Sequence, residues 1–386
     1  MIDKAALSSH KYFLMLQKQI GFIPVSKPVI SEKEISYVLD ALQSGWVSSL
    51  GKYIDEFEKQ FAIFCGVDHA IAVSNGTAAL HLSLLGYGVG AGDEVIVPDF
   101  TFVATANAVK YVGAIPVFAD IDEKTLCIDP EKIEKLITPK TKAIIPVHLF
   151  GHPADMTRIN EIANKYNLVV IEDAAEAHGA KVNGKKVGSL GNCGTFSLYA
   201  NKVITSGEGG FITTNDAELS KKLRLLLDHA MCKNKRYWHD MVGYNYRMTN
   251  LQAALGLAQL EQIDSFIRRR KEIFELYREQ LSGIKNIKLN YKADWAEPNY
   301  WMVCLEFLDF NEEKRNAIMI SLKEMNIDSR PFFYPLSDMP MYKGLTNTPV
   351  THKVSARGIN LPTFTSMEND SIKYICNAVH SLLKDS

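Results

Sequence analysis

The sequence has few cysteines, and none of them are paired at a metal-binding spacing. Six cysteines occur in 386 residues, at positions 65, 127, 193, 232, 304 and 376. No two of them form a CxxC motif, so neither a zinc site nor a disulfide framework is indicated, and we expect no metal. Free thiols suit a reducing compartment, which favours a cytoplasmic protein.

The sequence also lacks an excess of charge of one sign. It contains 43 Lys and Arg against 44 Asp and Glu, which gives a formal net charge of -1. Nucleic-acid-binding proteins carry a basic excess or a basic stripe, because their side chains neutralise phosphates. We therefore expect small molecules, rather than nucleic acid, as partners.

Long apolar runs are absent as well. No stretch approaches the roughly 18 apolar residues that span a bilayer, so we expect no membrane partner. Residues 1–22 include a short apolar piece at residues 12–16, but small cleavage-site residues do not follow it. These 22 residues are therefore interpreted as an N-terminal extension, either an extra helix or an arm, and not as a signal peptide.

What the sequence does contain is a series of continuous apolar runs separated by helical or turn segments. The runs lie at residues 70–73, 95–97, 116–118, 143–147 and 168–171. Apolar strands that alternate with helices predict an α/β fold whose mostly parallel sheet is covered on both faces. In such sheets, ligands bind beyond the carboxyl ends of the strands, so the polar residues that follow the runs are candidates for function.

The length of the chain favours two domains of unequal size. We expect a large domain at residues 23–264 and a smaller C-terminal α+β domain at residues 265–386. Two capping boxes predict helix starts, at Ser31 with Glu34 and at Thr249 with Gln252.

The second of these boxes opens a long helical pattern, which runs to Phe274. A further helical pattern follows the acid at Asp173. Both patterns rest on apolar residues at helical spacing.

Candidate reactive groups follow these strands. Lys202 comes five positions after Ser197 and precedes a glycine-rich turn at residues 207–210. Asp173 stands at the end of an apolar strand, and Phe102 follows another. Taken singly, Lys202 is an ordinary surface lysine, Asp173 an N-cap and Phe102 a core residue.

A fourth feature is Ser74-Asn75-Gly76-Thr77, which joins a predicted strand to a predicted helix. This arrangement points free backbone N–H groups at an anion, although the same residues also form ordinary turns and N-caps. Together the four features meet the needs of pyridoxal phosphate. That cofactor requires a Schiff-base lysine, a carboxylate for its ring nitrogen, and donors for its phosphate.

Several segments of the chain are specific enough to indicate a family. They are Ser-Gly-Trp-Val-Ser-Ser (44–49), Val-Ser-Asn-Gly-Thr (73–77), Gly-Asp-Glu-Val-Ile-Val-Pro (92–98), Val-His-Leu-Phe-Gly-His-Pro (147–153), Ile-Glu-Asp-Ala-Ala-Glu-Ala (171–177), Asn-Lys-Val-Ile-Thr-Ser-Gly-Glu-Gly-Gly (201–210), Arg-Tyr-Trp-His-Asp (236–240) and Gly-Tyr-Asn-Tyr-Arg-Met-Thr-Asn (243–250). From about Ile23 onward the chain resembles the sugar aminotransferases of the DegT/DnrJ/EryC1/StrS family. The resemblance implies the type I aminotransferase fold and a homodimer with active sites at the subunit interface.

The resemblance also implies roles for residues around the cofactor, pyridoxal 5'-phosphate (PLP) or its aminated form (PMP). Lys202 is expected to be the Schiff-base lysine, and Asp173 to pair with the pyridinium nitrogen. Phe102 is expected to stack on the ring. Glu176 stands near the phenolic oxygen, where many relatives have Gln or His.

Another set of residues is expected to hold the phosphate. Gly76, Thr77 and Ser197 belong to one subunit, and Asn245 reaches the same phosphate from the partner subunit. Relatives that deoxygenate the sugar carry histidine in place of the lysine, so Lys202 favours amination. Ala200, where close relatives have glycine, has no mechanistic explanation.

The reaction implied is amino transfer from L-glutamate to a nucleotide-linked 4-keto-6-deoxy sugar. Within the family, the likeness favours the conversion of GDP-4-keto-6-deoxymannose to GDP-perosamine for a surface polysaccharide such as the O-antigen of lipopolysaccharide. A UDP-linked, dTDP-linked or acidic keto sugar is the alternative, because sugar pockets are built from loops. A catalytically idle sugar-binding or regulatory relative is the alternative from another class. A Rossmann dehydrogenase is disfavoured, because no GxGxxG opens the first helix.

Overall fold

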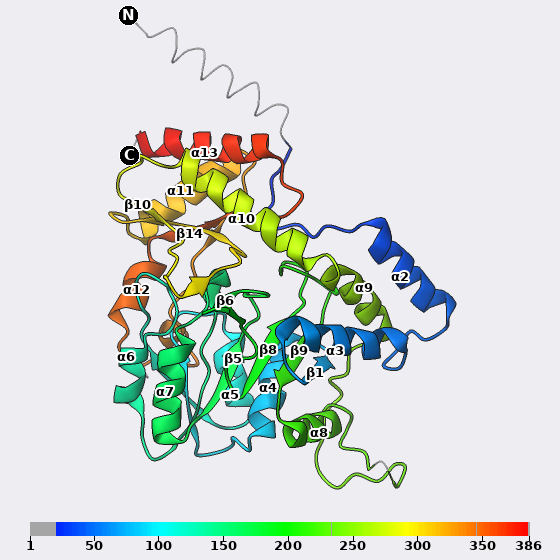
Figure 1. The fold of residues 1–386 in the computed structure, drawn as a ribbon. Helices are drawn as coiled ribbons and strands as arrows, with labels where there is room; N and C mark the ends of the chain where they lie inside the picture. The colour runs from blue at the N-terminus through cyan, green and yellow to red at the C-terminus, as the bar shows by residue number, and fades with distance from the viewer. Residues whose placement is uncertain (1–20, 233, 345, 385–386) are drawn as a thin grey trace, which may run out of the picture.

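A seven-stranded sheet forms the centre of the computed structural model, which describes residues 21–232, 234–344 and 346–384 (Figure 1). Along the sheet the strands are β1 (His69–Val73), β9 (Gly210–Thr214), β8 (Cys193–Ser197), β5 (Val169–Asp173), β4 (Thr141–Ile144), β2 (Glu94–Pro98) and β3 (Ile115–Ala119). Only β9 runs antiparallel to its neighbours, and the other pairs are parallel. The predicted mostly parallel sheet is confirmed.

Helices cover both faces of this sheet. The helices of this part of the chain are α2 (Glu32–Gln43), α3 (Lys52–Cys65), α4 (Gly76–Gly86), α5 (Ala104–Tyr111), α6 (Pro130–Ile133), α7 (Met156–Tyr166), α8 (Ala217–Leu226) and α9 (Asn250–Leu260), with the 3₁₀ turns η1 (Glu134–Leu136) and η2 (Leu149–Gly151). Of these, α2 packs on α9. Successive residues of a strand point to opposite faces, and on β2 both faces are apolar. Ile96 packs into one hydrophobic cluster, whereas Val95 and Val97 pack into the other. This double burial explains why the strands are continuous apolar runs.

A smaller four-stranded sheet lies toward the C-terminus (Figure 1). Its strands, in order, are β10 (Ile287–Leu289), β12 (Val303–Phe307), β14 (Gly358–Leu361) and β13 (Arg330–Pro331), all paired antiparallel. Its helices are α10 (Ile263–Gln280), α11 (Glu312–Glu324), α12 (Pro349–Ser355) and α13 (Asn369–Lys384), with the turn η3 (Leu336–Asp338). A third, short sheet joins β11 (Ala296–Glu297), β6 (Lys181–Val182) and β7 (Lys185–Lys186).

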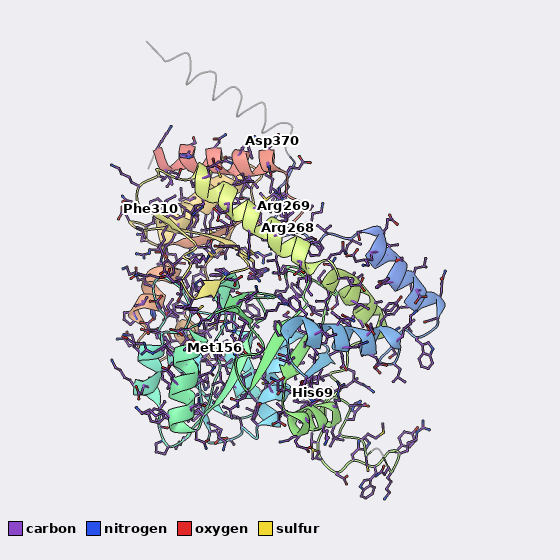
Figure 2. All side chains as sticks on the ribbon, viewed as in Figure 1. His69, Met156, Arg268, Arg269, Phe310 and Asp370 are labelled. Atoms are coloured by element: carbon purple, nitrogen blue, oxygen red, sulfur yellow. The ribbon has the colours of Figure 1, made fainter. Side chains whose placement is uncertain are left out.

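Side-chain contacts bind the last helix to this smaller unit. Arg269 on α10 donates hydrogen bonds to Met367 O at 2.7 Å and to Asn369 Oδ1 at 2.8 Å, beside the first turn of α13 (Figure 2). Ile23 also belongs here, because it pairs with Ile327 and packs in the C-terminal hydrophobic cluster. The first described residues therefore cross back to the C-terminal unit before the chain enters α2.

Both predicted capping boxes are present, at the starts of α2 and α9. Two helical predictions are wrong. The single long helix expected from Thr249 to Phe274 is broken between Leu260 and Ile263 into α9 and α10. The helix expected after Asp173 is a series of turns, so Asp173 is not an N-cap. The predicted extension lies outside the described residues, apart from residues 21 and 22. Within the described ranges, no helix is long and apolar enough to cross a membrane.

Candidate active site

One cavity of about 680 Å³ opens at the carboxyl ends of the central strands. Its walls come from the loops after β1, β2, β5 and β8 and from β13 and β14 of the smaller sheet. Seven of the eight residues predicted as a site line this cavity: Gly76, Thr77, Phe102, Asp173, Glu176, Ser197 and Lys202. The eighth, Asn245, does not line the cavity of its own chain.

Lys202 lies in the turn that follows β8, where its N–H donates to Tyr199 O at 2.9 Å. Its side chain is only 12% exposed, so the surface-lysine interpretation is wrong. Nζ lies 3.6 Å from Glu176 Oε1 and 4.2 Å from the centre of the Trp301 ring. A carboxylate and an aromatic face therefore hold this ammonium group at the cavity wall.

Asp173 ends β5 and is buried at the floor of the cavity. Thr105 Oγ1 donates to its Oδ2 at 2.8 Å, and Ala175 N donates to its Oδ1 at 3.2 Å. Burial raises the pKa of the Asp173 carboxyl above its usual range, while these hydrogen bonds act in the opposite direction. A cationic partner inside the cavity would relieve the cost of burying this charge.

Glu176 is a second buried acid of the cavity. Its Oε2 accepts a hydrogen bond from Phe150 N at 2.9 Å, which leaves Oε1 facing Lys202. Burial raises the pKa of the Glu176 carboxyl, and the Lys202 charge offsets part of that effect. The carboxyl is thus fixed beside the amine by the backbone of η2.

The first turn of α4 forms a narrow cradle together with the end of β8. The Asn75 side chain caps this helix by accepting from Ala78 N at 2.8 Å, and helix geometry leaves the preceding N–H groups without intrahelical acceptors. A Cβ added to Gly76 would lie 2.8 Å from Ser197 Cβ. The close approach of these two residues creates a small, polar, anion-sized recess at a helix N-terminus.

Phe102 and Asn245 differ from the buried acids in their surroundings. The Phe102 side chain is 56% exposed into the cavity mouth, with its ring centre 6.1 Å from that of Phe333, so it is not a core residue. Asn245 lies in the loop before α9, where its Oδ1 accepts from Arg247 Nη2 at 3.2 Å. Asn245 therefore lies outside the lining of its own cavity.

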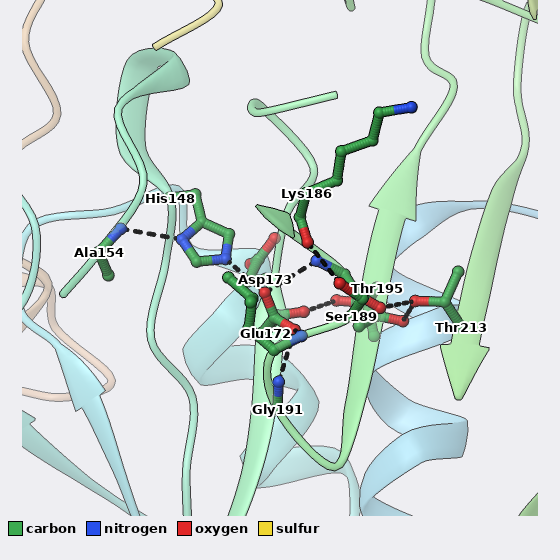
Figure 3. A network of polar contacts seen from close by, with 12 residues as sticks. His148, Ala154, Glu172, Asp173, Lys186, Ser189, Gly191, Thr195 and Thr213 are labelled. Carbon is green, nitrogen blue, oxygen red and sulfur yellow. Dashed lines mark hydrogen bonds and ion pairs between the residues drawn. The ribbon is translucent and has the colours of Figure 1, made fainter. Parts of the chain in front are cut away.

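A buried polar network supports Asp173 from behind (Figure 3). The preceding residue, Glu172, accepts hydrogen bonds from the backbone N–H groups of Gly188, Leu190 and Gly191 at 2.7 to 2.8 Å. Its Oε2 also lies 3.0 Å from His148 Nε2. Because Ala154 N donates to His148 Nδ1 at 3.0 Å, the proton of this imidazole resides on Nε2 and is donated to Glu172. The network anchors β5 to the loop that leads into β8.

Sequence reasoning missed several residues that the fold brings to this site. Thr105 stands three residues after Phe102 and reaches Asp173, and Trp301 reaches Lys202 from just before β12. Trp301 Nε1 also donates to Asn201 O at 2.7 Å. The one available signal for Thr105 was its place after a strand. Trp301 comes from a distant segment, and no local pattern indicates its contact.

A model of the DegT/DnrJ/EryC1/StrS aminotransferase family matches residues 28–380. The chain is 46% identical over 364 residues to the GDP-perosamine synthase of Caulobacter vibrioides, covering 94% of this chain and 98% of that protein. It is 45% identical over 365 residues to the GDP-perosamine synthase of Escherichia coli O157:H7, covering 94% and 99%. The PMP form of a sugar aminotransferase from Streptococcus pneumoniae superposes with a TM-score of 0.90 at 30% identity, covering 94% of this chain and 99% of that one.

Proposed function

The chain belongs to the DegT/DnrJ/EryC1/StrS family of PLP-dependent sugar aminotransferases, and from that premise we propose its substrates and the roles of its residues. It is a transaminase that uses PLP and PMP. We propose L-glutamate as the amino donor and GDP-4-keto-6-deoxymannose as the acceptor, with GDP-perosamine as the product. The relatives named GDP-perosamine synthase, which align over nearly their whole length, support this sugar.

The observation that carries the assignment of residues is the meeting of Lys202, Asp173 and the Gly76–Ser197 cradle in one cavity. This donor set fits the cofactor. A buried carboxylate suits a protonated ring nitrogen, a helix N-terminus suits a phosphate, and an amine in the same cavity suits a Schiff base. Asn201 also lines the cavity, and its buried Oδ1 has no hydrogen-bond partner among the described residues.

PLP, when bound, supplies an electron sink for the charge that develops as the Cα–H bond of the donor breaks. Lys202 Nζ removes that proton in the first half-reaction, and in the second it delivers a proton to the sugar carbon that receives nitrogen. Asp173 keeps a proton on the ring nitrogen. Glu176 fixes the amine and would serve the phenolic oxygen of the cofactor, and Phe102 would stack on its ring.

Gly76, Thr77 and Ser197 would hold the phosphate of the cofactor from one subunit. We propose that Asn245 of a second copy completes the phosphate site, because Asn245 lies outside the cavity of its own chain. A second observation supports a homodimer. Ile35, Leu39 and Leu42 expose one apolar face of α2, whose other side packs on α9.

We retain the division into a large PLP-binding domain at residues 23–264 and a small domain at residues 265–386 as a proposal. The separate C-terminal hydrophobic cluster supports it. We also propose a cytoplasmic location, since all six cysteines are free and five are buried as thiols. A role in making a surface polysaccharide is supported by a 39% identical relative, the spore coat polysaccharide biosynthesis protein SpsC of Bacillus subtilis.

The function is tested with the purified protein reconstituted with PLP. L-Glutamate should bleach the visible absorbance of the bound cofactor, and GDP-4-keto-6-deoxymannose should restore it. The dTDP- and UDP-linked keto sugars serve as matched competitors. The dTDP-linked sugar is included because DesI was solved in the presence of its TDP-sugar product. The structure of DesI superposes on this chain with a TM-score of 0.86 at 31% identity, covering 94% of this chain and 93% of that one. A preference for dTDP sugars would refute the GDP assignment, and an unchanged spectrum with glutamate would refute transamination.

A further inference from the structure

Trp301 comes from the smaller unit, and its ring meets the reactive Lys202 at the cavity wall. The side chain is buried, and hydrogen bonds fix it at three atoms. Trp301 N donates to Asn299 Oδ1 at 2.8 Å, and Nε1 donates to Asn201 O at 2.7 Å. The Trp301 carbonyl oxygen accepts from Arg270 Nη1 at 2.8 Å. Both the backbone and the indole ring of Trp301 are therefore held in one orientation.

Asn299 connects Trp301 to the loops that carry the other reactive groups. This buried amide donates from Nδ2 to Glu176 O at 3.3 Å and to His178 O at 3.1 Å. Its backbone N–H donates to Gly151 O at 3.1 Å. Gly151 has a φ of +92°, and a Cβ added there would clash with the Asn299 side chain. The segment that carries Trp301 therefore contacts the loop after β5, η2 and the turn after β8 at once.

The contact between Trp301 and Lys202 attracts the ammonium group without engaging its protons strongly. Lys202 Nζ lies 4.2 Å from the ring centre. A ring face attracts a cation but accepts hydrogen bonds only weakly. Glu176 Oε1 lies 3.6 Å from Nζ, beyond the roughly 2.7 to 3.2 Å of an ordinary hydrogen bond. Two electrostatic contacts thus hold the amine, and its N–H groups stay available to other atoms in the cavity.

A residue that carries a proton needs support of this kind. In the proposed reaction Lys202 removes a proton from the donor carbon and later delivers one, so between these steps it is an ammonium group. Its flexible four-carbon side chain has to stay in place during that interval. A carboxylate at hydrogen-bond distance would hold the ammonium group but would also compete for its proton. An aromatic face holds the amine and leaves the proton free for delivery.

We propose that Trp301 is a positioning residue for Lys202, and that its ring holds the ammonium group in place between proton removal and proton delivery. This role rests on the proposed function, in which Lys202 moves the proton. Because Trp301 belongs to the smaller unit, the docking of that unit on the central sheet also sets the place of the amine. The reactive lysine is therefore in position only when the two units are docked.

The test compares Trp301→Leu and Trp301→Phe with the control Trp295→Leu. Trp295 is half-buried, packs edge-on against His152 with ring centres 5.6 Å apart, and does not line the cavity. Each half-reaction is followed separately by the cofactor absorbance.

In Trp301→Leu, the rate of each half-reaction at saturating substrate should fall about 5- to 30-fold, because a desolvated cation–π contact is lost. The apparent affinities for L-glutamate and for the nucleotide keto sugar should stay within about twofold of the wild type, since the ring acts on the lysine and not on the substrates. Trp301→Phe keeps an aromatic face and should retain most of the rate. Trp295→Leu should react at the wild-type rate.

Chemical labelling gives a readout independent of turnover. The protein is reconstituted directly with PMP, which leaves Lys202 free, and treated with trinitrobenzenesulfonate. Peptide mass spectrometry then follows the modification of Lys202, with the exposed Lys221 as the internal reference. Lys202 should react faster in Trp301→Leu than in the wild type, because the ring no longer covers and holds the amine. Trp301→Phe and Trp295→Leu should label at the wild-type rate.

Three outcomes would overturn the proposal. They are unchanged half-reaction rates in Trp301→Leu, an equal loss in Trp301→Leu and Trp301→Phe, and a loss in Trp295→Leu as large as that in Trp301→Leu. The second would assign the effect to the Nε1 hydrogen bond, and the third to packing in general. If Trp301→Leu does not fold, Trp301→Met takes its place with the same expected results.

The labelling also separates this proposal from its premise. Failure of L-glutamate to convert the wild-type PLP form would refute the donor assignment of the proposed function. In that case, faster labelling of Lys202 in Trp301→Leu than in the wild type would still support Trp301 as the residue that holds the amine. Equal labelling in both proteins would overturn that contact as well.

Discussion

At the scale of single residues, the site depends on how burial changes the electrostatic contacts and the pKa values of its charged side chains. Lys202 and Glu176 face each other at 3.6 Å in a recess that excludes most water. Electrostatic contacts are stronger there than on the surface, because the effective dielectric constant is lower. The same burial raises the pKa of the Glu176 and Asp173 carboxyls, so an opposite charge is required to keep them ionised.

Replacing Lys202 by alanine should nearly abolish amino transfer. The variant loses the base and acid that moves the proton, a contribution of roughly 10²- to 10⁴-fold, together with the covalent link to the cofactor. Single-turnover bleaching with L-glutamate measures this loss. Lys221→Ala on the exposed face of α8 is the matched control and should keep wild-type rates. Substantial turnover by Lys202→Ala would contradict the catalytic role assigned to this lysine.

His152 should make the protein sensitive to acid. Burial lowers the pKa of this imidazole to about 4 in the fold, although a hydrogen bond to Pro153 O acts in the opposite direction. An unfolded histidine titrates near 6.5, so the unfolded state takes up the proton first as pH falls. Stability is therefore complete above about pH 6.5 and is lost toward pH 4, by about 3 kcal/mol in all.

The measurement is the fall in Tm between pH 7.5 and pH 5. His152→Asn, which cannot be protonated, should show a fall smaller than that of the wild type by about 2 to 5 °C. His69→Asn provides the control, since this half-buried histidine makes no side-chain hydrogen bond within the described residues. An equal fall in His152→Asn and the wild type would assign acid sensitivity to other groups.

At the scale of elements, the sequence predicts most where local rules decide. The capping boxes at Ser31 and Thr249 and the strand, turn and helix around Gly76 obey such rules, and all three are present. The prediction of one long helix after Thr249 is wrong because a tertiary contact lies at the break between α9 and α10. Gln262 Nε2 donates to Glu34 Oε1 at 2.7 Å at the break, and α9 and α10 then pack on different partners.

The residues of the candidate site also divide into those that local sequence patterns indicate and those that only tertiary contacts bring to the cavity. Lys202, Asp173 and Gly76 follow strands or turns and can be found from the chain alone. Trp301 and Arg330 come from the smaller unit, 99 and 128 residues after Lys202 in the chain, and reach the cavity only through the docking of the two sheets. The alternation of residues along a strand predicts which face of its own sheet a side chain points to, but it does not predict which distant residue that side chain contacts.

The cradle between α4 and β8 should be intolerant of a side chain at Gly76. An alanine Cβ there would lie 2.8 Å from Ser197 Cβ, so the helix start or the serine must shift away from the phosphate position. We expect the Kd for PLP to rise about tenfold, in line with the cost of overpacking. Gly90→Ala is the control, because a Cβ at Gly90 meets nothing closer than 4.0 Å. Unchanged PLP affinity in Gly76→Ala would show that the phosphate lies elsewhere.

At the scale of the whole molecule, one chain leaves much apolar surface uncovered. Trp46 and Leu50 follow α2 with exposures of 57% and 68%, and Val242 reaches 81% in the loop that projects beyond α8 (Figure 1). Monomers rarely expose large contiguous apolar patches. A second copy of this chain would cover these side chains and bring its Asn245 to the first copy's cavity. Sedimentation velocity should therefore find a dimer.

Mixing two defective variants tests whether Asn245 acts across that dimer. At limiting PLP, Lys202→Ala and Asn245→Ala homodimers should each be nearly inactive, because every site lacks either the amine or a phosphate contact. If Asn245 acts in the partner's site, a mixed dimer contains one site with both native residues. Random exchange of subunits should then restore about a quarter of wild-type activity. If Asn245 acts within its own chain, both sites of a mixed dimer are defective, and mixing should restore nothing.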